Sequence, residues 1–494
     1  MVAAVAEDFL HPDSELVLGL VAPVGTDLDG LQAVLEDRLR EHFGYEPDVV
    51  RLSKLIQQVE LSVAVEEAPP VRRYNSYMTA GNAARKAANR GDFLALSAVY
   101  EILQKRPGGN NGRRQPLARR AHILRSLKHP MEVRTLRQIY GSGFFLIGAS
   151  SPPDVRRRYL ENDKNIDPTD VDALLKRDQD EGDPLGQRTR DTFELSDAYI
   201  SLNGTDWKAE LWRVLDLLFA RPDVTPTRDE YAMFLAYAAS LRSLDLSRQV
   251  GAVIASPDGE IISTGANDVP KSGGGLYGGD ASDAQHRDWH HGCDANEVER
   301  NRITAQVIRA LTGEKGEDDA LVRAHEVALE NTGLLDLTEF GRAVHAEMEA
   351  LLACARSGVS PRGATLFSTT FPCHNCAKHI IAAGIARVVY VEPYPKSRAH
   401  QLHADALTLG DEAGKVRFEP FVGIGPRRFI DLFSMKLSSG TELKRKVRKS
   451  KGETVSWERG AAQLRVRMAP ISYLDREEIA AKRLNDVFAR QGES

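Results

Sequence analysis

Four residues in the second half of this chain combine the side chains of a metal site with a carboxylate. His345 and Glu347 stand two positions apart, and Cys373 and Cys376 follow in a P-C-x-x-C sequence. One imidazole and two thiolates can hold zinc and leave a fourth position open for water, whose pKa zinc lowers from about 15.7 towards about 7. The spacing therefore predicts His345, Cys373 and Cys376 as ligands of a catalytic zinc and Glu347 as the group that moves protons.

The order H-x-E followed by P-C-x-x-C is typical of zinc-dependent nucleobase deaminases. In that chemistry the carboxylate takes a proton from water, passes it to the ring nitrogen beside the attacked carbon, and protonates the departing ammonia. A structural zinc knuckle or a redox pair would also explain Cys373 and Cys376, and a core histidine would explain His345. These alternatives leave Glu347 without a role, and a structural zinc normally has four protein ligands.

The segments around these residues predict a domain of alternating strands and helices. Apolar, β-branched runs predict four strands, at 249–255, 260–265, 364–368 and 387–391, the first two joined by a Pro-Asp-Gly turn. Periodicity predicts three helices, at 229–246, 345–356 and 376–383. Metal ligands would then lie at two helix starts, where the helix dipole favours a thiolate at Cys373.

Two finer expectations concern packing in this region. The first helix is expected to bury the apolar residues that recur at three and four spacing, which are Tyr231, Phe234, Leu235, Ala238, Leu241 and Leu244. Cys354 lies on the apolar side of the helix after Glu347. It is expected to be a small buried hydrophobic side chain, not a ligand.

Five blocks of the chain resemble successive motifs of deoxycytidylate deaminases. They are S-R-Q-V-G-A-V-I at 247–254, S-T-G-A-N at 263–267, H-A-E at 345–347, P-C-H-N-C at 372–376 and A-A-G-I at 382–385. The resemblance covers about residues 228–425 and implies a cytidine-deaminase-like α/β/α domain with a mixed sheet, acting on a free deoxynucleotide. It also implies that Asn267 binds the sugar hydroxyl, that the backbone at Ala346 faces the base, and that Arg248 contributes to substrate binding.

An insertion at 271–340 separates these blocks, and cations near it could bind a substrate phosphate. The candidates are Lys271, Arg342, Tyr394, Lys396 and Arg398; the alternative is that most are surface side chains. The insertion also contains a group of possible ligands for a second, structural zinc: His286, His290, His291 and Cys293. A polar loop with scattered histidines explains the second group equally well.

Composition bounds the remaining functions. The chain has 494 residues, 42% hydrophobic and 27% charged, which suits two or three globular domains. Four cysteines favour a reducing cytoplasm over a disulfide framework. Residues 1–10 do not have the pattern of a secretion signal, and no apolar span reaches the about 18 residues of a membrane helix. The net charge of -5 argues against a general nucleic-acid binder.

Residues 1–222 predict a separate module. A buried strand at 15–22, a tight loop and an amphipathic helix at 28–43 resemble the start of a P-loop nucleoside or nucleotide kinase, which implies a three-layer α/β fold. Runs at 123–130, 143–148 and 198–202 resemble later strands, and 207–220 a final helix. The phosphate loop is degenerate: Gly25 keeps the second glycine, but Leu20 replaces the first, Thr26 the lysine and Asp27 the magnesium-binding hydroxyl.

A carboxylate at that position repels phosphate, so we expect a regulatory or assembly module and not an active kinase. Mg²⁺ would enter only together with a nucleotide at this loop. The C-terminal extension, 426–494, carries a basic segment at 444–451 that either contacts RNA or is solvated. Within it we expect a strand pair at 455–468 and a helix at 475–489, and the first module offers another basic face with Arg72, Arg73, Arg85, Lys86 and Arg90.

A degenerate kinase-like module fused to a deoxycytidylate deaminase resembles bacterial anti-phage deoxycytidine nucleotide deaminases. That resemblance implies conversion of dCTP and dCMP to dUTP and dUMP, a homo-oligomer, and inhibition by a small RNA in some members. The alternatives are an ordinary dCMP deaminase of pyrimidine metabolism and a deaminase acting on RNA or single-stranded DNA. The latter needs basic and aromatic surfaces, and aromatic residues make up only 7% of the chain. A regulatory binding protein with an inert zinc would not need Glu347.

Overall fold

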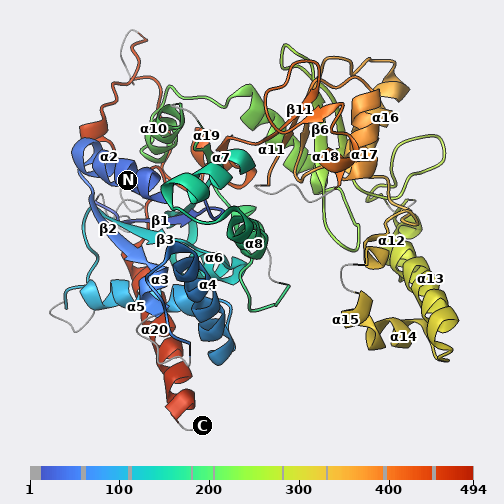
Figure 1. The fold of residues 1–494 in the computed structure, drawn as a ribbon. Coiled ribbons are helices and arrows are strands. Elements are labelled where there is room, and N and C mark those ends of the chain that lie inside the picture. The colour runs from blue at the N-terminus through green and yellow to red at the C-terminus, as the bar shows by residue number, and fades with distance from the viewer. Residues whose placement is uncertain are drawn as a thin grey trace. The chain divides into compact units, whose positions relative to one another are not determined.

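The chain folds into two compact units (Figure 1). The computed structural model describes residues 13–56, 63–108, 114–179, 182–203, 206–280, 283–329, 332–392, 398–447 and 452–492. The first unit comprises Met1–Glu230, Glu392–Pro395 and Pro420–Ser494, and the second comprises Tyr231–Val391 and Lys396–Glu419. The C-terminal extension therefore belongs to the first unit instead of forming a separate domain.

The first unit is built on a six-stranded sheet in the order β12-β5-β4-β1-β3-β2. Five strands are parallel: β1 (Leu16–Val21), β2 (Glu46–Arg51), β3 (Arg120–Arg125), β4 (Phe144–Ser150) and β5 (Ala198–Ser201). The short β12 (Gly423–Ile424) pairs antiparallel with β5. Every residue of β1 is buried, as expected of a central strand in a parallel sheet covered on both faces.

Helices connect and cover these strands. They are α2 (Leu28–Phe43), α3 (Leu52–Ile56), α4 (Pro70–Ala87), α5 (Phe93–Lys105), α6 (Pro130–Tyr140), α7 (Pro153–Arg158), α8 (Pro168–Gln179), α9 (Thr189–Phe193), α10 (Trp207–Leu218), α19 (Phe429–Phe433) and α20 (Pro470–Gly492). The predicted strand at 15–22 and helices at 28–43, 207–220 and 475–489 are confirmed. The run at 123–130 is a strand only to Arg125, because Pro130 begins α6.

Two expectations about this unit are wrong. Residues 455–468, all of which the structure describes, form no strand. Instead their side chains attach the segment to the core: Trp457 Nε1 donates to the carbonyl of Phe219 at 2.9 Å, and Arg459 pairs with Asp216 at 2.8 Å. The expected basic face on the first module is neutralised, since each cation pairs with a carboxylate: Arg72–Glu66, Arg73–Glu67, Arg85–Glu132, Lys86–Asp183 and Arg90–Asp92.

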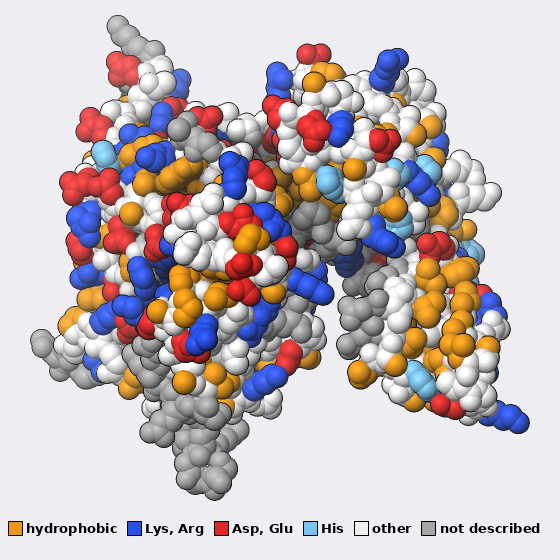
Figure 2. Space-filling view, in the orientation of Figure 1, with side chains coloured by type: hydrophobic (Ala, Val, Ile, Leu, Met, Phe, Trp, Pro, Cys, Tyr) orange, Lys and Arg blue, Asp and Glu red, His pale blue; other side chains and the backbone are white. Residues whose placement is uncertain are grey.

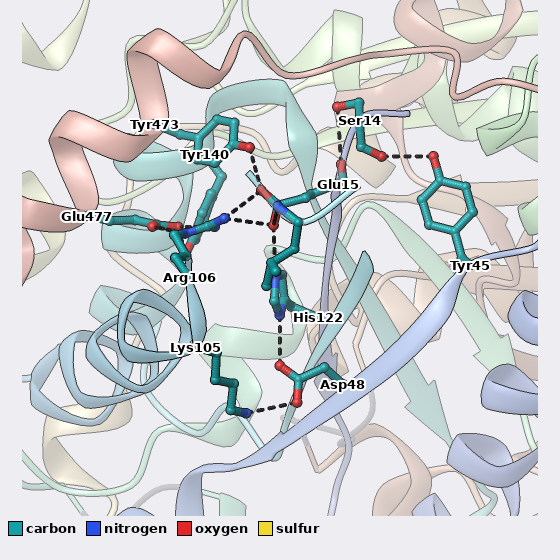
Figure 3. Close-up of polar contacts among 11 residues, drawn as sticks. Ser14, Glu15, Tyr45, Asp48, Lys105, Arg106, His122, Tyr140, Tyr473 and Glu477 are labelled. Carbon is teal, nitrogen blue, oxygen red and sulfur yellow. Dashed lines mark hydrogen bonds and ion pairs between the residues drawn. The ribbon is translucent and has the colours of Figure 1, made fainter. Parts of the chain in front are cut away.

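A buried ion network fastens α20 to the start of β1 (Figure 3). Arg106 donates to Glu477 at 2.6 and 2.8 Å and to Glu15 at 2.8 and 3.0 Å. His122 lies between Glu15, at 3.3 Å, and Asp48, at 3.0 Å, and Lys105 donates to Asp48 at 2.8 Å. Arg106 and Lys105, together with His122 when it is protonated, thus face three carboxylates, which is the pairing that buried charge requires.

The second unit contains a mixed sheet in the order β10-β11-β9-β8-β6-β7. Its strands are β6 (Gly251–Ala255), β7 (Ile261–Ala266), β8 (Thr365–Ser368), β9 (Arg387–Tyr390), β10 (Leu407–Thr408) and β11 (Val416–Pro420). β6 pairs antiparallel with both β7 and β8, and β8 pairs parallel with β9. The four strands expected here are confirmed, and Gly259, at φ +92°, forms the hairpin turn between β6 and β7.

Two glycines let helices approach this sheet closely. A Cβ on Gly251 would lie 1.8 Å from the carbonyl oxygen of Ala236 on α11 (Arg228–Ser240), and one on Gly265 would lie 2.1 Å from that of Ala346 on α16 (Ala346–Ser357). Close approach favours small side chains, and α11 buries Ala232, Ala236 and Ala239 together with Met233. The expected apolar face of α11 is therefore wrong: Tyr231 and Leu241 are exposed, and α11 ends at Ser240, not at 246.

The remaining helices of the second unit are α12 (Asp288–His291), α13 (Ala295–Thr312), α14 (Asp318–Ala324), α15 (Glu326–Leu329), α17 (His374–Ala382) and α18 (Ala399–Leu402). Those of the insertion form a small core of their own around Ala305, Ile308 and Leu321. Figure 2 shows apolar side chains gathered on the surface of this segment, where Leu311 is 81% exposed. Within the described ranges, no helix is both long and apolar enough to cross a membrane.

Candidate active site

The structure brings His345, Cys373 and Cys376 together. Their donor atoms lie within 4.8 Å of one another, and His345 Nδ1 is 3.3 Å from both sulfur atoms. A tetrahedral zinc with bonds of about 2.0 Å to nitrogen and about 2.3 Å to sulfur separates such donors by about 3.5 Å. The three side chains therefore fit a zinc ion without rearrangement.

Glu347 completes the group. One carboxylate oxygen, Oε2, lies 3.5 Å from Cys376 Sγ, and the other, Oε1, accepts a hydrogen bond from Ser368 Oγ at 3.3 Å. The side chain is buried, and burial raises the pKa of Glu347, an effect that the nearby Cys373 thiolate reinforces. A carboxyl group in this position can hold a proton near neutral pH more readily than an exposed glutamate.

Helix starts position all four residues. His345 is the N-cap of α16 and Cys373 is the N-cap of α17, whose Sγ accepts from the Cys376 N–H at 3.4 Å. The hydrogen bond from the Cys376 thiol, opposed by burial, lowers the pKa of Cys373 to about 3. The Cys373 side chain in turn raises the pKa of His345. A thiolate at Cys373 is the form that binds zinc.

A residue that the sequence did not single out, Asp268, holds the chain before His345. The backbones of Asp268 and Val344 exchange two hydrogen bonds, at 2.9 and 3.3 Å. The buried Asp268 carboxylate accepts from the N–H of Leu244 at 2.9 Å and pairs with Arg287. Ser368 was also missed; a serine at the end of an apolar strand was the available signal.

The proposed sugar and base contacts lie in the same unit. Asn267 is buried, and its amide already bonds the backbone on one side: Oδ1 accepts from the Val250 N–H at 2.6 Å, and Nδ2 donates to the carbonyl of Arg248 at 2.8 Å. Ala346 is fully buried at the start of α16. The Arg248 side chain is exposed. Asn267 therefore orders the segment before β6, whatever it contributes to a ligand.

The described candidates for phosphate binding lie on the surface, two of them in ion pairs. Lys271 pairs with Asp283 at 2.9 Å and Arg342 with Asp288 at 2.6 Å. Arg398 is exposed at the start of α18. Tyr394 and Lys396 lie outside the described residues. The two described cations beside the insertion are thus already neutralised by carboxylates that the sequence analysis did not connect to them.

No three of the four candidates for a second zinc lie close enough together to share an ion. Among the described residues, which include all four candidates, the His345 group is the only one with three donors close enough for a metal. His290 and His291 are consecutive on the short α12, so their side chains diverge by about 100° around the helix axis. His286 packs against the ring of Tyr277 instead, at 4.9 Å between centroids. Cys354 is buried and donates to Ser263, as a small core residue does.

The loop expected to be a degenerate phosphate loop lies in the first unit, between β1 and α2. Gly25 has φ +85°, which a glycine adopts without strain, and the Asp27 carboxylate accepts from the Gly30 N–H at 3.0 Å as the N-cap of α2. Thr26 is buried. Of the basic segment 444–451, Lys444–Val447 are described, and Arg445 donates to the carbonyl of Pro222 at 2.8 Å.

The four site residues all lie in the part of the chain that matches a described protein family. Residues 226–392 match the family described as "Cytidine and deoxycytidylate deaminase zinc-binding region". The chain is 35% identical over 170 residues to the deoxycytidylate deaminase of Enterobacteria phage T4, covering 33% of this chain and 77% of the relative. It is 26% identical over 162 residues to that of Homo sapiens, covering 33% of this chain and 63% of the relative.

Among solved structures, the chain is similar to a dCMP deaminase from the cyanophage S-TIM5 in complex with dCMP and dUMP. The identity is 22% and the TM-score 0.24, over 40% of this chain and all of that structure. So low a score does not establish a shared fold.

Proposed function

Because this chain belongs to the deoxycytidylate deaminase family and is a hydrolytic deaminase, we propose that its second unit converts dCMP and dCTP to dUMP and dUTP. One observation carries this proposal. The His345, Cys373 and Cys376 donors converge, and the Glu347 carboxylate lies beside them, 3.5 Å from Cys376 Sγ. Three ligands with an adjacent carboxylate suit a catalytic site better than a closed structural site.

The residues divide the chemistry between them. A zinc ion held by the three donors would supply a Lewis acid that lowers the pKa of water. Glu347 takes a proton from water as the water oxygen adds to carbon 4 of cytosine, and delivers this proton to ring nitrogen 3. It then takes the proton of the new hydroxyl on carbon 4 and passes it to the exocyclic amine, so that the carbon–nitrogen bond breaks, ammonia leaves and carbon 4 becomes a carbonyl. Ser368 donates to Oε1, which leaves Oε2, 3.5 Å from Cys376 Sγ, as the oxygen on the side of the metal ligands.

Substrate selection is assigned to the residues around this group. Asn267 would bind the sugar hydroxyl with the hydrogen-bonding capacity that Val250 and Arg248 leave unused, and the backbone at Ala346 would face the base. Lys271, Arg342 and Lys396 would bind phosphate, with Arg248 and Tyr394 beside them. For Lys271 and Arg342 this requires exchange of Asp283 and Asp288 for the ligand.

The first unit is assigned a regulatory or assembly role. Its parallel sheet, with a glycine loop after β1, is compatible with a nucleotide-binding ancestry, while Thr26 and Asp27 replace the residues that a kinase needs. Together with the resemblance of the whole layout, this supports a homo-oligomer that depletes deoxycytidine nucleotides during phage infection. Control by a small RNA is part of the same proposal.

Uracil formation from four substrates tests this function. Purified protein would be incubated with dCMP, dCTP, cytidine and a cytosine-containing oligonucleotide, with Glu347→Gln as the inactive control. We expect product from dCMP or dCTP and none from the other two. Turnover of the oligonucleotide alone would replace the proposal with a polynucleotide deaminase. Turnover of cytidine at the same rate as dCMP would show that the site does not recognise the phosphate.

A further inference from the structure

The first unit contains a cavity of about 510 Å³ that the deaminase chemistry does not use. It lies at the carboxyl ends of β1, β2 and β3, and is lined by the loop after β1, by α4 and by residues that follow β2 and β3. Ligands of open parallel sheets bind at this edge, and the volume suits a small molecule of nucleotide size. All of its lining residues belong to one unit.

Amides of the loop after β1 already have partners within the chain. The Val24 N–H donates to the carboxylate of Asp178 at 2.7 Å and the Thr26 N–H to the carbonyl of Pro23 at 3.2 Å, and in the first turn of α2 the Gly30 N–H donates to Asp27 at 3.0 Å. Lys128, which donates to the loop carbonyl of Ala22, also pairs with Asp178 at 2.8 Å. The chain's own carboxylates therefore occupy the positions that a bound phosphate and its metal would need.

Positive charge lies instead on the side of the cavity formed by β2 and β3. Arg125 donates to Asp29 at 2.6 Å, whereas Arg51 reaches the same carboxylate only at 3.9 Å. One carboxylate faces two guanidinium groups, so Arg51 keeps donors for an anion. Lys164 adds a further cation, with Nζ 5.0 Å from the ring centroid of Tyr159.

Flat and apolar side chains complete the wall. Tyr74 and Tyr159 line the cavity, as do Leu52, Ile56 and Met78. Burial raises the pKa of the Tyr74 hydroxyl, so this group stays neutral and the site keeps its positive charge. Aromatic rings beside cations accept a nucleobase and its phosphate together.

Thr26 supplies an independent sign of a ligand. Its side chain lines the cavity and is 7% exposed, and its hydroxyl has no hydrogen-bond partner among the described residues. A buried hydroxyl without a partner is destabilising, and native proteins keep few of them. A polar group of a bound molecule would satisfy it.

We propose that this cavity binds a nucleoside monophosphate without a divalent metal, its phosphate held by Arg51 and Lys164 and a polar group satisfied by Thr26. The site differs from a kinase donor site, in which a lysine of the loop and Mg²⁺ hold the phosphates. It makes the first unit a nucleotide-binding module independent of the deaminase reaction, so it can be tested whether or not that reaction occurs.

Equilibrium dialysis of the full-length protein tests the proposal. The probes are dAMP, dGMP, dTMP and AMP, which lack the cytosine ring that the deaminase site is proposed to take. At least one should bind with one site per chain, and added Mg²⁺ should change the affinity less than about twofold. Arg51→Ala should weaken that probe about tenfold and leave the corresponding nucleoside unchanged, since a charge-assisted hydrogen bond is lost.

Two further variants locate the site. Thr26→Val keeps the shape of the side chain but removes the hydroxyl, so it should weaken binding about three- to tenfold while raising the Tm of the ligand-free protein. The matched control is Arg158→Ala, at an exposed position of α7 that does not line the cavity. It should change neither the affinity for the nucleotide nor the Tm. Binding that Arg51→Ala and Thr26→Val leave intact would overturn the location, and absence of binding by all four probes would overturn the site itself.

Discussion

The ion network of the first unit and the metal-ligand group of the second both bury several ionisable side chains, but they balance charge differently. In the network, Arg106, His122 and Lys105 face Glu15, Glu477 and Asp48 (Figure 3). In the ligand group, the Cys373 side chain faces His345, and the buried Glu347 carboxyl group, whose pKa is raised, lies beside them. The first group pairs its cations and carboxylates with one another, whereas the second brings together imidazole and sulfur donors that a metal ion can bind.

This difference separates a structural role from a chemical one. The network joins the start of β1, the end of α5 and the helix α20, so its bonds connect segments more than 300 residues apart, such as Arg106 and Glu477. The ligand group is drawn from two helix starts and keeps a carboxylate oxygen beside its donors. Loss of a charge should therefore cost stability in the first group and catalysis in the second.

Glu347→Gln should separate catalysis from stability. Removing the proton-transfer group should lower kcat by about 10²–10⁴-fold, because general acid–base catalysis is lost. The amide has the same shape and no buried charge, so Tm and zinc content should stay close to the parent values. Steady-state kinetics, a thermal melt and metal analysis measure the three quantities. A fall in Tm as large as that of a network variant would show that Glu347 is needed for stability as well as for catalysis.

Arg106→Met should have the converse effect. It leaves Glu15 and Glu477 buried without their common cation, which should cost about 3–5 kcal/mol in the free energy of unfolding of the first unit. Denaturant unfolding followed by the fluorescence of Trp207, Trp212 and Trp457, all in this unit, measures the loss. Arg158→Met, a control at an arginine whose side chain is 65% exposed, should change the value by less than about 1 kcal/mol.

Gly265→Ala tests whether backbone packing places the ligand group. The new Cβ would lie 2.1 Å from the carbonyl oxygen of Ala346, so α16 must shift together with His345 and Glu347. We expect a cost of about 1–3 kcal/mol and reduced zinc occupancy after dialysis. Gly279→Ala, in the same unit with open space around the position, is the control. Full occupancy with normal activity would show that α16 tolerates the displacement.

The smallest effect should be a pH dependence of the network. Burial lowers the pKa of His122, but the hydrogen bonds to Asp48 and Glu15 have the larger effect together and raise this pKa above 6.5. The folded state then binds a proton more tightly than the unfolded state, so the contribution of His122 is complete below pH 6.5 and is lost as the pH rises through the folded pKa. The difference in Tm between the parent and His122→Gln should shrink from pH 6 to pH 9.

At acid pH the same network should lose stability for the opposite reason. The pKa of Glu15 is lowered from 4.5 to about 2, because the bonds to His122 and Arg106 outweigh its burial. Its contribution is therefore present above pH 4.5 and is lost as the pH falls towards 2. A parent Tm that stays constant over this interval would show that these carboxylates are not paired in solution.

Much of the second unit was predictable because its signals are local. The strands from β6 to β9 alternate with turn residues at short range, and the ligands cap helices that begin beside them. The face of α11 was not predictable from periodicity. It depends on Gly251, which lies 15 residues after Ala236 and lets the backbone of α11 approach the sheet closely. The ion pairs of Lys271 with Asp283 and of Arg342 with Asp288 were equally out of reach, since they join residues 12 and 54 positions apart.

The sequence by itself determined the chemistry of this protein: the identity and order of His345, Glu347, Cys373 and Cys376 define a donor set and a base before any fold is known. It also showed that the loop at Gly25 lacks the lysine and the hydroxyl of a phosphate-binding loop. Only the tertiary structure decided what the amides of this loop bind. The carboxylate that accepts from the Val24 amide belongs to Asp178, 154 residues away, and no local pattern can report a partner brought by the folding of a distant helix.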